Sequence, residues 1–136
     1  MEDVIETNRD VVMSLFASEL GRGPSERPHT VAALEAYLSA LVRALRRRQR
    51  EEPEALRIAR EHGAQLARMH YDVGVLVREF VSLRTAIVTV LRSRGAPSLD
   101  DIECLTDFIH VAMLASTREF LSRSRQVGPA LHLRSK

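Results

Sequence analysis

The chain has 136 residues, of which 45% are hydrophobic, 28% charged and 4% aromatic. This length fits one globular domain with its own core and is too short for two ordinary domains. The single cysteine, Cys104, excludes a scaffold held by internal disulfides. The formal net charge is only +2, and all but one of the basic residues are arginine, so nucleic acid is not favoured as a partner.

The sequence carries no signal for a membrane. No apolar run is long enough to span a bilayer, and Glu2, Asp3, Glu6 and Asp10 make the first segment acidic where a signal peptide would be positive. We therefore expect a soluble, cytoplasmic protein.

Apolar residues recur at spacings of three and four without sustained alternation, which predicts an all-α fold: a single bundle of about five helices. The first helix is expected over about residues 3–20, with Gly21 ending it in a left-handed turn. A loop containing Gly23 and Pro24 follows. Thr30 is a candidate N-cap for the second helix, which ends in the basic run 43–50, expected to be a solvated face.

Local signals divide the remaining chain. Pro53, among glutamates, predicts the start of a third helix that runs to about residue 71. Asp72 can cap a fourth helix to about residue 94, although one long bent helix is the alternative. Ser98 and Asp101 resemble a capping box that opens a fifth helix to about residue 123. We expect residues 1–125 to form the helical domain and residues 126–136 a flexible tail or linker to an output domain.

The fifth helix is apolar on two sides. One stripe surrounds Ser116, and the opposite side carries Cys104, Val111, Leu114 and Leu121. A helix that is apolar all round is buried on both sides. It is therefore either the central helix of a monomer or the seam of a homodimer.

Some polar residues interrupt the apolar stripes. On helical wheels, His70 lies within the inward arc of the third helix, with His62 at its edge, and Arg84 lies within the stripe of the fourth. A buried guanidinium needs a carboxylate, for which Glu79 is a candidate, or water, or an anionic ligand. These residues, with Tyr71, are the candidate ligand-binding site; the alternative is that they are hydrogen-bonded core residues.

No catalytic or metal-binding signature is present. The five histidines lack metal-ligand spacing, and there is no phosphate-binding loop, nucleophile elbow or dinucleotide fingerprint, so we expect neither an enzyme nor a metal site. Haem ligation by His62 or His70 stays open as an alternative. Another is a histidine phosphotransfer bundle with an exposed His62 as phosphoacceptor, although Gln65 and Leu66 stand where that family has lysine and glycine.

The segment from Ala59 to Ile87 resembles the RsbRD-type N-terminal domain, the helical sensory module of stressosome co-antagonists and of many bacterial sensor histidine kinases. The matching elements are His62-Gly63, Arg68, Tyr71-Asp72, Leu76-Val77-Arg78-Glu79-Phe80, Leu83-Arg84, Asp107-Phe108-Ile109 and Arg118-Glu119-Phe120, with Phe80 where tyrosine is expected.

The resemblance implies a dimeric, non-catalytic input domain, related in architecture to globin-like sensors that usually lack haem. Such a domain passes a conformational change, caused by a small-molecule signal or a partner, to an output domain. Because no kinase segment follows Lys136, we expect either a separate sensor domain or a free-standing regulator.

Overall fold

The computed structural model describes residues 1–21 and 28–135, with side chains as far as residue 125. Within these ranges the chain folds into six helices: α1 (Glu2–Thr7), α2 (Arg9–Glu19), α3 (Pro28–Arg47), α4 (Pro53–Arg68), α5 (Val73–Arg94) and α6 (Leu99–Ser135). No strand occurs in the described ranges, and the predicted all-α fold is confirmed. The expected loop at Gly23 and Pro24 lies outside them.

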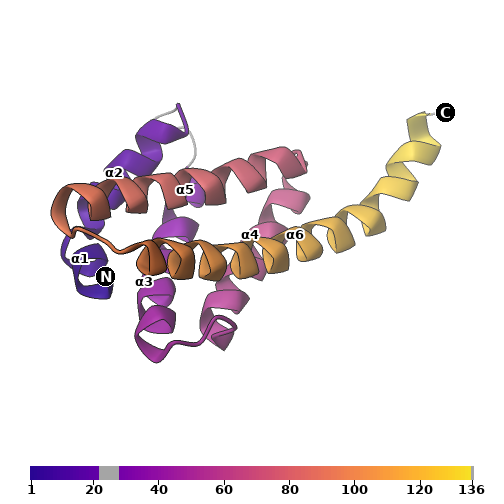
Figure 1. Cartoon of the computed structure of the whole chain (residues 1–136). Coiled ribbons are helices and arrows are strands. Elements are labelled where there is room, and N and C mark those ends of the chain that lie inside the picture. Colours follow the sequence, from indigo (N-terminus) through magenta and orange to yellow (C-terminus); the bar gives the residue numbers. More distant parts are fainter. Residues whose placement is uncertain (22–27, 136) are drawn as a thin grey trace.

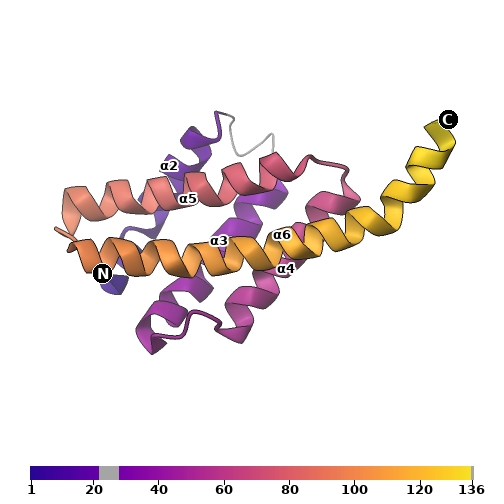
Figure 2. The same ribbon diagram turned by 45° about the vertical axis from the view of Figure 1, so that its right-hand side comes forward.

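The helices form two crossing groups. The long helices α5 and α6 run antiparallel and side by side, while α3 and α4 cross this pair (Figure 1). The same arrangement is visible in Figure 2, where α6 also continues past the other helices at its C-terminal end. Helix α2 packs on α5, and α4 makes its most extensive contacts with α6. The apolar core lies between these groups.

Most of the predicted helix starts and ends are confirmed. Pro53 opens α4 next to the capping side chain of Glu52, and Asp72 caps α5 by accepting a hydrogen bond from the Gly74 amide at 3.3 Å. Ser98 and Asp101 form the expected capping box at the start of α6. The break at Asp72 excludes the alternative of one long bent helix.

Three helix boundaries differ from the predictions. The first helix is broken at Asn8, whose side-chain amide bonds the Val4 carbonyl at 2.8 Å and thereby competes with the helical backbone. Helix α3 begins at Pro28, so Thr30 lies inside it and is not its N-cap. Helix α6 continues to Ser135, well beyond the expected end near residue 123.

Helices α4 and α6 approach each other closely at Gly63 and Ser116. A Cβ atom added to Gly63 would lie 2.1 Å from the Ser116 carbonyl oxygen and 2.9 Å from its Oγ. No real side chain fits at such distances, so glycine is required for this crossing. The Ser116 side chain is buried there, and its Oγ has no hydrogen-bond partner among the described residues.

The basic run at the end of α3 is exposed, as predicted, and fastens neighbouring helices. Arg46 bonds Asp3 at 2.9 Å and Glu6 at 2.5 Å on α1, and Arg50 bonds Asp107 on α6 at 2.8 Å. None of the described helices combines the length and hydrophobicity needed to cross a bilayer.

Candidate functional site

Three polar side chains from three different helices meet in the core. Glu79 of α5 places Oε1 2.5 Å from His62 Nε2 of α4, and its Oε2 accepts a hydrogen bond from Thr30 Oγ1 of α3 at 2.9 Å. The side chain of Glu79 is fully buried, and that of His62 is 3% exposed. We call these three residues the buried triad.

Helical periodicity explains why the three residues point inward. Thr30 is one turn before Leu34 on the buried stripe of α3, and His62 lies between Ala59 and Leu66 on the buried stripe of α4. Glu79 occupies the corresponding place on α5, where Leu76, Leu83, Ala86 and Val90 are buried around it. Each polar residue therefore replaces an apolar one in its stripe.

The short contact between His62 and Glu79 is a charge-assisted hydrogen bond. The carboxylate can accept from a neutral imidazole or from an imidazolium, or a carboxyl group can donate to a neutral imidazole. In each arrangement one proton lies between Nε2 and Oε1. Because both side chains are buried, any change in the number of protons on the pair changes the net charge inside the core, which is costly.

Aromatic rings surround the buried triad. The Phe80 ring meets His62 edge-on with centroids 6.4 Å apart, and Tyr37 meets Phe80 in the same manner at 5.5 Å. Burial raises the pKa of the Tyr37 phenol far above its usual value, so this hydroxyl stays neutral. The buried triad thus lies beside apolar aromatic surfaces.

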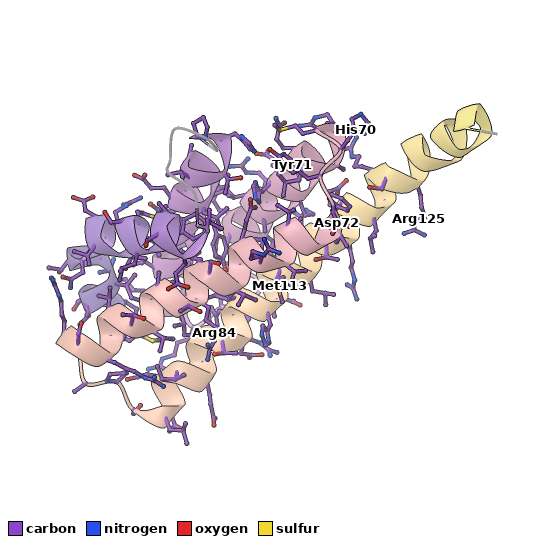
Figure 3. All side chains as sticks on the ribbon, turned by 90° about the horizontal axis from the view of Figure 1, so that it is seen from above. His70, Tyr71, Asp72, Arg84, Met113 and Arg125 are labelled. Carbon is purple, nitrogen blue, oxygen red and sulfur yellow. The ribbon has the colours of Figure 1, made fainter. Side chains whose placement is uncertain are left out.

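The prediction that His70 faces the core is wrong. Helix α4 ends at Arg68, and His70 has a left-handed φ of 61° in the turn that follows. The amides of His70 and Tyr71 bond the carbonyls of Ala67 and Leu66 at 3.1 Å, which is a Schellman turn. The turn points His70 to solvent (Figure 3). Tyr71 is half-buried, with its ring centroid 6.1 Å from that of His29.

The predicted pair of Arg84 with Glu79 is also wrong. Arg84 is half-buried, and its Nε donates to Thr106 Oγ1 on α6 at 2.7 Å. Figure 3 places Arg84 midway along α5 and His70 at its beginning. A rise of 1.5 Å per residue separates Asp72 from Arg84 by about 18 Å along the helix, so the structure does not bring His70 and Arg84 into one site.

A groove of about 990 Å³ runs along α3 and α4 and reaches α6. Its lining includes His62, so one member of the buried triad also forms part of this surface. Three alanines, Ala33, Ala36 and Ala64, are among its lining residues. The groove residues with charge are Arg43, Arg57, Arg60, Arg68, Arg123, Glu54, Glu61 and Glu119.

The position of His62 bears on the other roles considered for it. A phosphoacceptor histidine must be exposed, and His62 is buried. Its Nε2 atom contacts Glu79, so ligation of haem iron through that atom would first break the pair. Among the described residues, no three histidine, cysteine, aspartate or glutamate side chains gather to hold a metal ion.

Sequence reasoning identified His62 and Glu79 but paired Glu79 with the wrong cation and missed Thr30. The available signal was the spacing of Glu79 with Leu76, Leu83 and Ala86, which marks one face of α5. In comparisons with known proteins, no family model, curated protein or solved structure matched the chain significantly. The resemblance to RsbRD-type domains therefore stays a prediction.

Proposed function

We propose that this chain is a non-catalytic input (sensor) domain of a bacterial signal-transduction protein, such as a sensor histidine kinase, that relays a signal through dimeric helix packing. The buried triad carries the proposal, because it joins α3, α4 and α5 through one carboxylate. The resemblance of residues 59–87 to RsbRD-type sensory domains supports the same assignment.

A buried polar contact adds little to the stability of a fold, but the helix packing around it responds strongly when the contact is changed. Removing water from two ionisable groups costs about as much as their attraction returns, so an apolar core would serve stability equally well. Disturbing one member of the triad changes the contacts of three helices at once. A signal that binds two packing states unequally can therefore shift the equilibrium between them at this point.

The next residue along α4 connects the triad to α6. Gly63 follows His62 directly and lies against the backbone of Ser116. Any movement of α4 that accompanies a change at His62 must therefore alter the contact with α6, since no flexible side chain lies between the two backbones. In our proposal α6 carries this change to the output domain of the same protein or of a partner.

The solvent face of α6 is the proposed dimer contact. Leu114 is 50% exposed and Leu121, two turns later, is 43% exposed; both lie on the side predicted for a seam. Val77 and Val81 of the adjacent helix α5 are exposed as well. A second copy of the chain would cover these apolar side chains in a two-fold interface.

Hydrogen exchange tests the relay. Glu79→Gln keeps the shape of the side chain but removes its charge, and we expect faster amide exchange in α4 around His62 and in α6 around Ser116. Glu35→Gln, at an exposed position on α3, is the matched control and should leave both regions unchanged. Faster exchange confined to α5 in the Glu79 variant would contradict the relay.

Light scattering on a size-exclusion column tests the dimer. We expect the wild-type chain and Met69→Glu to be dimers and Leu114→Glu to be a monomer with the same helix content. Met69 is 41% exposed at the end of α4 and so controls for the loss of an exposed apolar side chain. A monomeric wild-type chain, or a dimeric Leu114→Glu variant, would refute the interface.

A further inference from the structure

We propose that the groove along α3 and α4 is a docking surface for an acidic, extended segment of a partner protein. Three observations carry this inference: the length of the groove, the small side chains in its lining, and three lining arginines that form no ion pair with a described carboxylate.

The shape of the groove suits an extended chain. The wall formed by α4 reaches from Glu54 to Arg68, which is about 21 Å at the helical rise of 1.5 Å per residue. Six residues of extended chain cover about 20 Å. Alanines at positions 33, 36 and 64 leave room for a partner backbone to approach closely.

Some charges of the groove are already paired within it. Arg57 donates to Glu54 at 3.0 Å and to Glu61 at 2.7 Å. The bond from Arg57, with a smaller attraction from Arg43, holds the pKa of Glu54 below its usual value. Arg123 of α6 bonds Glu119 at 2.9 Å. Among the described lining residues, the three carboxylates are therefore hydrogen-bonded to two of the five arginines.

The remaining arginines are Arg43, Arg60 and Arg68. No aspartate or glutamate of the described chain forms an ion pair with them. Arg60 and Arg68 are separated by about 12 Å along α4, and acidic side chains four residues apart on an extended segment are separated by about 13 Å. Charge complementarity of this kind selects an acidic partner and guides its approach.

Docking in the groove has a route to the core through His62. Because this residue lines the groove and bonds Glu79, a bound segment would lie beside one member of the buried triad. Only this consequence rests on the proposed function, since the docking surface itself depends on the groove alone.

A fluorescein-labelled peptide of six glutamates is the probe, measured by fluorescence anisotropy against the whole chain. We expect saturable binding, at least about tenfold weaker after the combined change Arg43→Gln, Arg60→Gln and Arg68→Gln. The control combines Arg78→Gln, Arg92→Gln and Arg125→Gln, exposed positions that do not line the groove. It loses the same charge and should bind as the wild type does.

Three outcomes overturn the docking surface. Absence of saturable binding refutes it, and equal weakening in both triple variants shows attraction by overall charge. Binding of pyrophosphate but not of the peptide shows a site for small anions. Hydrogen exchange distinguishes a failure of docking from a failure of the proposed function. Peptide binding that leaves amide exchange in α6 unchanged contradicts the relay alone. If the peptide does not bind, but Glu79→Gln speeds amide exchange in α4 and α6, docking alone is contradicted.

Discussion

The energetics of the buried triad can be measured with a double-mutant cycle on His62 and Glu79. Glu79→Met removes the carboxylate and leaves a buried imidazole without its partner at 2.5 Å. His62→Leu leaves the fully buried carboxylate without the imidazole. Breaking a buried pair by removing one member costs about 3–5 kcal/mol, so independent effects would sum to about 6–10 kcal/mol in the double variant.

The double variant should instead lie within about 3 kcal/mol of the wild type. Two apolar side chains of similar volume can fill the same space, and the main remaining loss is the acceptor of the buried Thr30 hydroxyl. Urea unfolding followed by circular dichroism measures all four proteins, and an unchanged denaturant slope shows that the unfolding transition stays comparable. The exposed pair of Arg123 and Glu119 is the control: Arg123→Gln should change stability by no more than about 0.5 kcal/mol. Losses in the double variant that equal the sum of the single losses would refute the interaction.

Other changes test single features of the structure. Gly63→Ala should lower stability by about 2 kcal/mol, because overpacking against the Ser116 backbone outweighs the better helix propensity of alanine; a gain in urea stability would mean that α4 and α6 do not meet there. His70→Gly should raise the free energy of unfolding by about 1 kcal/mol, because glycine adopts the left-handed φ without strain. Arg92→Gly, inside α5, should lower it by about as much. Melting temperatures that shift in the same direction in both variants would contradict the turn. Burial raises the pKa of the Cys104 thiol, so iodoacetamide should label it more slowly in the folded protein than in urea. The raised pKa contributes stability at neutral pH that disappears as the pH rises through the folded-state value. An equal labelling rate in the folded and unfolded protein would contradict the burial of this thiol.

The helix boundaries were predictable where a short segment determines them. Asp72, Pro53 and the pair Ser98 with Asp101 act on amides within three residues, so their effect can be read without knowledge of the rest of the fold. The turn at His70 was not predictable in this way. A left-handed position is usually occupied by glycine, and nothing in the residue type announces that histidine takes it here.

The site was predicted only in part because it depends on which face of α5 is covered. A wheel drawn through Val77 and Phe80 places Arg84 inside and Glu79 at the side. In the structure, the buried face of α5 is centred near Leu83. With 100° of rotation per residue, this face lies roughly 60° away from the one that the wheel predicts. The packing of α2 and α6 on α5 sets this rotation, and helical periodicity alone cannot supply it. Thr30 was missed because threonine serves equally as a cap and as a buried donor.

Helix α6 continues without a break beyond Ser116, so a small tilt at this crossing would produce a larger displacement at the end of the helix. From Ser116 to the end of the helix at Ser135 the distance is about 28 Å at 1.5 Å per residue. A tilt of about 5° at the crossing would swing that end by about 2–3 Å, which is comparable to the helix displacements that accompany known allosteric transitions. In the proposed relay, α6 therefore amplifies a small tilt at Ser116, because its C-terminal part reaches past the bundle (Figure 2).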